Sequence, residues 1–159
     1  MKVIFALLLA AFTGARPAQA PTPVTIALTI GGKSYQAKGQ GECTYAPVGS
    51  IYGVRASRWS VQYSGGAGAG LRSMSLTLWH PLAGATADQM SFAASVGASS
   101  YRIDTVQGQG RQTVGAGTVR VQQKGMGGRL EVDGKDTKGT AIRGSVECAR
   151  WASPEAVAG

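Results

Sequence analysis

The segment "VTIALTIGGKSYQAKGQGECTY" (residues 24–45) decides the fold. Residues 24–30 alternate between branched apolar side chains and Thr or Ala, which is the pattern of a β-strand with one buried face. Gly31-Gly32 follows and predicts a two-residue hairpin turn, because glycine accepts the positive φ that such turns need. The returning segment again places apolar side chains two residues apart and reaches Cys43 near its end. The folded part of the chain is therefore expected to open with an antiparallel β-hairpin.

The same alternation recurs along the rest of the chain, in segments separated by short glycine-rich stretches. The expected strands are 24–30, 33–45, 54–63, 71–79, 100–108, 117–123, 128–134 and 139–148. Segment 80–97 lacks this alternation and Thr86 is a suitable N-cap, so we expect one short helix near 86–94. Together these patterns predict an all-β domain, an antiparallel β-sandwich or small barrel of seven or eight strands.

The first twenty residues have the order of a secretory signal peptide. Lys2 supplies a positive charge, a ten-residue apolar run follows over 3–12, and Ala-Gln-Ala at 18–20 is a small-x-small cleavage triplet. The run is too short to span a bilayer, which needs roughly 20 apolar residues, and no later segment is apolar enough. We expect a periplasmic or secreted protein that is not transmembrane. Its predicted parts are a signal peptide over 1–20, a single β domain over 21–152 and a flexible tail over 153–159.

Export changes the interpretation of the two cysteines. In an oxidising compartment two thiols usually form one disulfide, so we expect Cys43 to pair with Cys148. A redox or metal pair is the alternative, but neither cysteine has a second ligand nearby and His80 is the sole histidine of the chain. A closed loop of about 105 residues stabilises a fold by roughly 4–5 kcal/mol in the chain-entropy model.

Two stretches of the sequence resemble a known family. "IGGKSYQAKGQGECT" (30–44) and "GTAIRGSVEC" (139–148) look like the first hairpin and last strand of the mycobacterial LpqH-type lipoprotein antigens, which also end in Cys. The resemblance implies a disulfide-tied β domain displayed outside the cytoplasmic membrane, with no established enzymatic activity. This sequence departs from the family because it has no lipid-bearing Cys, and its middle does not share the likeness.

The charge balance points to anionic partners. Without Lys2 and Arg16 of the signal peptide, 14 basic residues face 8 acidic ones, a net charge of +6. Such a balance attracts an anionic envelope polymer, lipid headgroups or an acidic protein, and export argues against nucleic acid. The alternative is that the charges only solvate outer sheet faces and discourage edge pairing. The candidate ligand-binding residues are Trp79, His80, Arg58 and Arg102.

Catalytic patterns are sparse. A small secreted hydrolase could use His80 with a serine and with Asp88 or Asp104 as the orienting carboxylate, although no Gly-x-Ser-x-Gly motif arranges them. Glu131, Asp133 and Asp136 form the one close carboxylate cluster, which fits a turn better than a glycosidase pair or a Ca²⁺ loop. We therefore predict an exported non-catalytic protein without cofactor or metal, with the hydrolase as the alternative.

Overall fold

The computed structural model describes residues 20–66, 70–83, 87–108 and 110–154, and every regular element in these ranges is a β-strand. The strands are β1 (Thr22–Ile30), β2 (Lys33–Ile51), β3 (Val54–Ser64), β4 (Leu71–Pro81), β5 (Gln89–Val96), β6 (Ser99–Asp104), β7 (Ala116–Lys124), β8 (Gly127–Lys135) and β9 (Ala141–Cys148). The predicted signal segment up to residue 19, the proposed cap Thr86 and the last five residues of the expected tail lie outside the described residues.

All nine strands belong to one antiparallel sheet in the order β6-β5-β4-β3-β2-β1-β9-β8-β7. Each strand therefore lies beside its neighbours in sequence, and β1 also pairs with β9, from Val24↔Cys148 to Ile30↔Ile142. At the two ends of this order, β6 and β7 approach each other through the single bridge Asp104↔Val114. The sheet is thus a nearly closed barrel, and the all-β prediction is confirmed.

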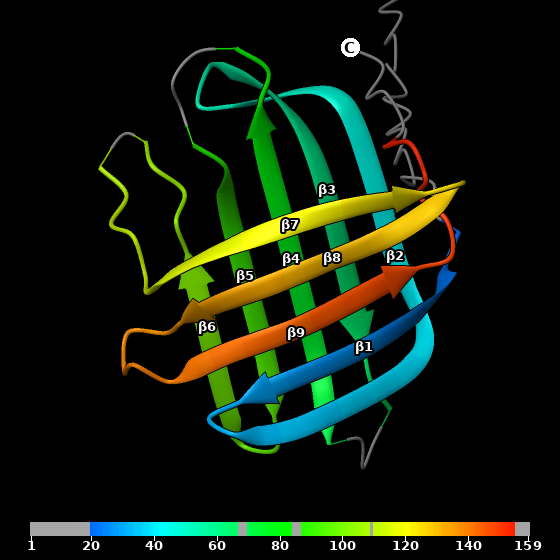
Figure 1. Ribbon diagram of the computed structural model, residues 1–159, viewed down its shortest axis with the longest axis vertical. Helices are drawn as coiled ribbons and strands as arrows, with labels where there is room; N and C mark the ends of the chain where they lie inside the picture. The colour runs from blue at the N-terminus through cyan, green and yellow to red at the C-terminus, as the bar shows by residue number, and fades with distance from the viewer. Residues whose placement is uncertain (1–19, 67–69, 84–86, 109, 155–159) are drawn as a thin grey trace, which may run out of the picture.

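The barrel is flattened into two layers that cross at a steep angle (Figure 1). Strands β1, β9, β8 and β7 form one layer, strands β3 to β6 form the other, and the long strand β2 bends from the first into the second. The bend falls at Gly41, which pairs with Thr22 of β1 and with Tyr63 of β3. A Cβ at this position would lie 2.8 Å from the carbonyl oxygen of Gln62, so the close approach requires glycine.

The core lies between the two layers and follows the predicted alternation. In β1 every second residue is buried, and Ile26 and Leu28 face Leu76, Phe92 and other apolar residues of one cluster. Burial of such side chains stabilises the fold by about 25 cal/mol per Å² of apolar surface. Trp59 belongs to this cluster and stacks on Tyr45 with ring centroids 4.7 Å apart.

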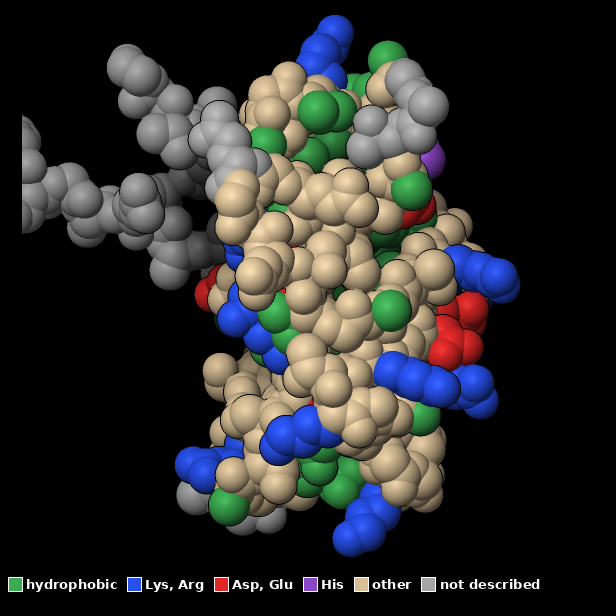
Figure 2. All heavy atoms as spheres, turned by 90° about the vertical axis from the view of Figure 1, so that its left-hand side faces the viewer, with side chains coloured by type: hydrophobic (Ala, Val, Ile, Leu, Met, Phe, Trp, Pro, Cys, Tyr) green, Lys and Arg blue, Asp and Glu red, His purple; other side chains and the backbone are tan. Residues whose placement is uncertain are grey.

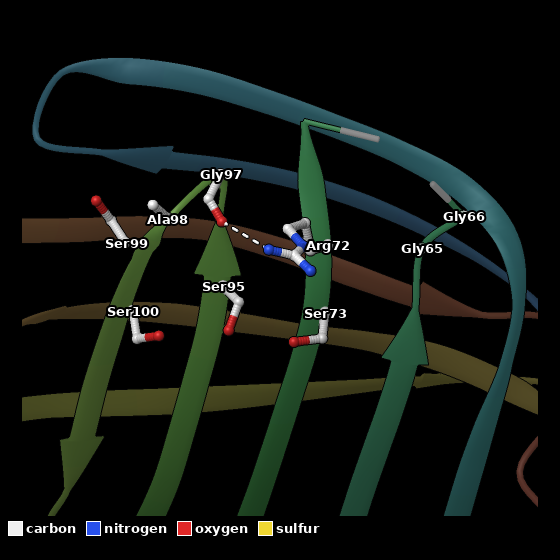
Figure 3. A pocket seen from close by; sticks show the side chains of 9 residues that line it. All are labelled: Gly65, Gly66, Arg72, Ser73, Ser95, Gly97, Ala98, Ser99 and Ser100. Carbon is white, nitrogen blue, oxygen red and sulfur yellow. Dashed lines mark hydrogen bonds between the residues drawn. The ribbon is translucent and has the colours of Figure 1, made fainter. Parts of the chain in front are cut away.

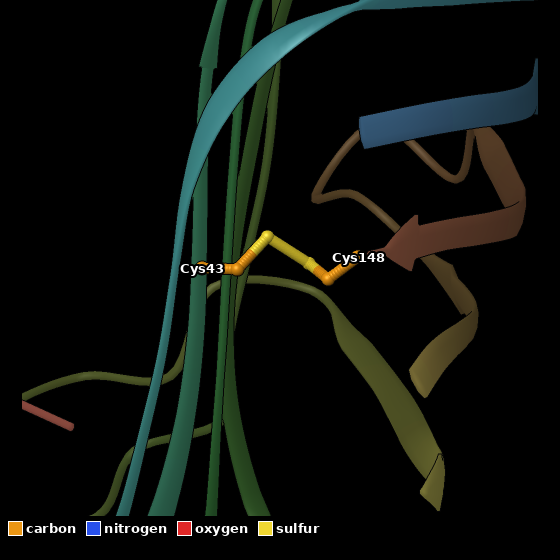
Figure 4. Close-up of a disulfide and its surroundings, with 2 residues drawn as sticks. All are labelled: Cys43 and Cys148. Carbon is orange, nitrogen blue, oxygen red and sulfur yellow. A yellow bond between two sulfur atoms is a disulfide. The ribbon is translucent and has the colours of Figure 1, made fainter. Parts of the chain in front are cut away.

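The disulfide between Cys43 and Cys148 is formed, as predicted from the sequence. It crosses the interior and joins β2 in one layer to the end of β9 in the other (Figure 4). Both cysteines are buried, and beyond Cys148 the chain returns to β2, where the N–H of Ala152 donates to the carbonyl of Cys43 at 2.9 Å. A buried disulfide indicates an oxidising environment.

The predicted helix near 86–94 is wrong, because residues 89–96 form strand β5. Met90, Phe92 and Ala94 point into the core, while Ser91 and the next alternate residues point outward. The strand pairs with β4 on one side and with β6 on the other. With β5 included the sheet has nine strands among the described residues, one more than the upper number of the predicted seven or eight.

Candidate functional site

The outer surface of the layer formed by β1, β9, β8 and β7 carries both basic and acidic side chains, some of them in ion pairs. Arg143 contacts Asp133 at 3.1 Å, and Arg129 contacts Glu147 at 3.2 Å as well as Glu131. In a view from the side, acidic groups lie between basic ones along this layer (Figure 2). These ion pairs neutralise Arg129 and Arg143, whereas Arg120, Lys124 and Lys135 of the same layer make no ion pair among the described residues.

The outer surface of β2 to β6 has a different chemistry. The strand registers place hydroxyl and amide side chains beside one another in rows across this face. These side chains are Thr44, Ser60, Gln62, Ser64, Ser73, Ser75, Thr77, Ser91, Ser95 and Ser100. Among the described residues of these outward rows, the acidic groups are Glu42 and the buried Asp104. The face can donate and accept many hydrogen bonds and carries little negative charge.

A groove of about 350 Å³ lies on this face over β2, β3 and β4. Arg58 and Trp79 are directly paired across β3 and β4, and both line the groove. The other lining residues are Glu42, Thr44, Ser60, Gln62, Thr77 and Pro154. The hydroxyls of Ser60 and Thr77 are hydrogen-bonded to each other at 3.1 Å within the groove. Side chains from three strands and from the chain's C-terminal segment thus converge on one hollow.

The two largest side chains of the groove have different surroundings. Trp79 is half-buried because it packs against a small apolar cluster of Ile51, Ala56 and Val106. Arg58 is also half-buried, its Nε is buried without a hydrogen-bond partner, and it makes no ion pair within the ranges that the structure describes. An unpaired buried donor costs roughly 1–3 kcal/mol. The guanidinium of Arg58 therefore has no carboxylate partner among the described residues and can pair with an anionic ligand.

This set of side chains is suited to an acidic sugar. An indole ring offers a flat apolar surface with a polar edge, and a guanidinium binds carboxylate or phosphate oxygens through parallel hydrogen bonds. Gln62 and the hydroxyls of Ser60 and Thr77 supply the few oriented polar groups that define a small-molecule site. Glu42 in the same groove can accept hydrogen bonds from sugar hydroxyls.

A second hollow, of about 640 Å³, lies on the same sheet face near the other end of β4 (Figure 3). Nη1 of Arg72 donates to the carbonyl of Gly97 at 3.2 Å, which positions the guanidinium at the rim. The hydroxyls of Ser73 and Ser100 point toward the middle strand, which carries Ser95 (Figure 3). The hollow offers one cation and several hydroxyls to an oxyanion.

The four ligand-binding residues predicted from the sequence do not all meet. Arg58 and Trp79 share the groove. His80 follows the alternation onto the other face of β4, and Arg102 lies on β6, where its Nη2 contacts Asp104 at 2.9 Å. Glu42 and the other groove residues were not predicted from the sequence, although their outward positions in alternating strands were a usable signal.

His80 takes part in a different constellation at the end of the barrel. Its Nδ1 lies 2.7 Å from Oδ1 of Asp88, and Ser57 is its directly paired neighbour on β3. The hydroxyl of Ser57 donates to the carbonyl oxygen of His80 at 3.4 Å rather than to the ring. Within the described ranges, no serine hydroxyl is hydrogen-bonded to the imidazole. Asp88 therefore orients His80 as a potential base, but no described serine is positioned beside the imidazole as a nucleophile.

Of the three residues in the predicted acidic cluster, Asp136 serves a turn, whereas Glu131 and Asp133 lie on β8 and pair with arginines. Oδ1 of Asp136 accepts hydrogen bonds from the backbone N–H groups of Lys138 and Thr140, at 2.9 and 2.8 Å. In the part of the chain that the structure describes, no three His, Cys, Asp or Glu residues are grouped to hold a metal ion. The same part has no helix with the length and apolarity needed to cross a bilayer.

Comparisons with family models, with curated proteins and with solved structures find no match for this chain. The resemblance to LpqH-type antigens therefore stays a prediction. The function has to be argued from the geometry of the groove and from its charges.

Proposed function

We propose that this protein is an exported, non-catalytic β-barrel that binds an anionic polysaccharide of the cell envelope. The observation that carries the proposal is the cross-strand pair of Arg58 and Trp79, which line one groove on a hydroxyl-rich sheet face. Export is supported by the signal-like sequence over 1–20 and by the buried disulfide, and it implies a periplasmic or secreted protein.

The ligand is expected to be a chain rather than a single sugar. Ser73 and Trp79 lie on the same outer face of β4. Their six-residue separation corresponds to roughly 20 Å along a strand, so the Arg72 hollow and the Arg58 groove are far enough apart to hold different units of one polymer. Binding at both places raises the overall affinity, because the second contact becomes intramolecular. Exposed charges make such binding sensitive to salt.

The test is calorimetric titration of the mature protein with polygalacturonate, with neutral dextran as the uncharged polymer. Arg58→Ala should lower the affinity for polygalacturonate by roughly tenfold or more, since a lost charge-assisted hydrogen bond is worth about 1.5–3 kcal/mol, and Trp79→Ala should lower it because the apolar surface for the sugar ring is removed. Arg120→Ala removes the same charge from the other layer and is the matched control. If Arg58→Ala and Arg120→Ala lower the affinity equally, the attraction is nonspecific and binding in the groove is contradicted.

A second candidate function, a small secreted hydrolase, is supported by the contact between His80 and Asp88. A carboxylate that orients an imidazole is one part of a nucleophilic site, and Ser57 is the nearest cross-strand hydroxyl. Labelling of the mature protein with a fluorophosphonate probe tests it. Labelling that disappears in His80→Ala and Ser57→Ala would favour the hydrolase, whereas the binding protein proposed above should not be labelled.

A further inference from the structure

One end of the barrel carries an unusual share of exposed apolar side chains. Five large hydrophobic residues are at least 36% exposed among those that the structure describes, and four of them lie at this end. They are Val48 at 61%, Tyr52 at 49%, Val54 at 36% and Leu82 at 45%. Isolated exposed apolar residues are ordinary on a protein surface, whereas a group at one place calls for a partner.

These four residues lie on two neighbouring connections, and we call them together the apolar tip. Val48, Tyr52 and Val54 belong to the hairpin between β2 and β3, and Leu82 follows β4. The N–H of Leu82 donates to the carbonyl of Arg55 at 2.9 Å, so the two connections are tied together. Figure 1 shows the β2–β3 turn and the end of β4 side by side at the top of the barrel.

The tip is held in place by contacts beneath it. Tyr52 has a φ of 48°, a left-handed conformation that few non-glycine residues adopt. Its hydroxyl accepts a hydrogen bond from Nη1 of Arg111 at 2.6 Å, and its ring lies so close to Gly108 that a Cβ there would be 2.5 Å away. A strained residue that persists in this way is fixed by its surroundings, which is common at binding surfaces.

The charges around the tip are mainly positive. Arg55 is exposed between Val54 and the chain that holds Leu82, and Arg111 is exposed beside Tyr52. Among the described residues, two acidic side chains lie near this end, and both already have partners. Asp88 contacts His80, and the buried Asp104 binds Arg102 and Arg111.

We propose that the apolar tip docks this barrel onto a membrane surface rich in anionic lipid headgroups. Apolar side chains on a convex end can enter the boundary between headgroups and acyl chains, while flanking arginines bind lipid phosphates. A polysaccharide is the weaker candidate for this surface, because a glycan chain is held in a concave site and gains little from protruding aliphatic groups. The tip proposal does not depend on the groove, which lies on the side of the barrel.

Sedimentation of the mature protein with large vesicles tests the proposal. Vesicles of phosphatidylglycerol should bind it and vesicles of phosphatidylcholine should bind it much less, with binding reduced at high salt. The double variant Val54→Ser with Leu82→Ser should lower the apparent affinity at least about tenfold, because both apolar side chains lose their transfer from water. Arg55→Gln should weaken binding to the anionic vesicles alone.

Matched controls keep the outcome clear. Met126, the fifth exposed hydrophobic residue at 68%, lies in the β7–β8 turn, so Met126→Ser removes comparable apolar surface elsewhere and should not change binding. All of these positions are exposed, and unchanged melting curves would show that the variants fold. The proposal is overturned if phosphatidylglycerol vesicles do not bind at low salt, or if Met126→Ser weakens binding as much as the tip variant. Gln62 lines the groove and lies outside the apolar cluster under the β2–β3 hairpin, so retained vesicle binding in Gln62→Ala would separate the tip from the groove, whereas its loss would attribute the binding to the groove and contradict docking through the tip.

Discussion

The carboxylate of Asp104 accepts a hydrogen bond from Nη2 of Arg111 at 3.1 Å, at the opening between β6 and β7. The same buried carboxylate contacts Arg102 at 2.9 Å and accepts the N–H of Val106 at 3.1 Å. Arg111 lies on the connection from β6 to β7 and also bonds the hydroxyl of Tyr52, which raises the pKa of its guanidinium. Asp104 therefore anchors the β6–β7 connection at the opening of the barrel, where β6 and β7 are not continuously hydrogen-bonded.

Replacing Asp104 by Asn should destabilise the protein by about 1–3 kcal/mol, because a charged acceptor at the centre of several hydrogen bonds is lost. The effect stays below that of a fully buried ion pair, since the arginine side chains are 57% and 45% exposed and water can solvate them. Urea unfolding followed by circular dichroism measures it.

Asp133→Asn is the matched control for this change. Asp133 contacts Arg143 on the outer surface with 65% of its side chain exposed, so its loss should cost about 0–1 kcal/mol. If the two variants unfold at the same urea concentration, Asp104 does not fasten the opening.

The disulfide should contribute much of the stability of the domain. It joins residues 105 positions apart and links the two layers across the core. The double variant Cys43→Ala with Cys148→Ala should lose roughly 2–5 kcal/mol, mainly because the unfolded chain is no longer constrained. Thermal unfolding with and without reductant provides the measurement. A melting temperature that does not change on reduction would contradict the prediction.

The parts of the fold that depend on local pattern could be predicted from sequence. The hairpin of β1 and β2, most of the other strands and the disulfide follow from alternation, turn glycines and the cysteine count. Strand β5 was missed because its outward side chains, Ser91, Ala93 and Ser95, are small and differ little from the neighbouring turn segments. A period of two is hard to detect where the contrast between faces is weak.

Only part of the candidate binding site could be predicted from the sequence, and the reason differs from that for strand β5. Arg58 and Trp79 could be named because arginine and an outward tryptophan carry recognisable chemistry. Their pairing depends on the register of β3 against β4, which one sequence does not specify. The contact of Tyr52 with Arg111 joins residues 59 positions apart and depends on the path of the β6–β7 connection. Such contacts appear only when the strands are placed together.

Gly108 should be required for the conformation of Tyr52. A Cβ at this position would lie 2.5 Å from Cδ2 of the Tyr52 ring, so Gly108→Ala must displace the ring and weaken its bond to Arg111. We expect Gly108→Ala to lower the free energy of unfolding by about 1–3 kcal/mol, as at other overpacked sites. Gly66→Ala is the control, because nothing lies within 4 Å of its Cβ position. Thermal unfolding that changes equally in both variants would refute the packing argument.

Gly41 should be the least replaceable glycine of strand β2. It pairs with β1 and β3 at once, and its Cβ position lies 2.8 Å from the backbone oxygen of Gln62 and 3.0 Å from Val24. Replacing glycine by alanine in a strand normally raises the free energy of unfolding by about 0.5–1 kcal/mol, because alanine restricts the unfolded chain. Here we expect a net loss of roughly 1–3 kcal/mol, since backbone cannot move aside without breaking the pairing.

Gly39→Ala on the same strand tests this reasoning by comparison. Its Cβ position lies 3.2 Å from the ring of Tyr63, a side chain that can shift by a few tenths of an ångström. Gly39→Ala should therefore cost clearly less than Gly41→Ala in urea unfolding, although both change the same residue type in one strand. The reverse order would mean that the bend of β2 does not depend on the close approach at Gly41, and that β2 passes between the two layers by some other means.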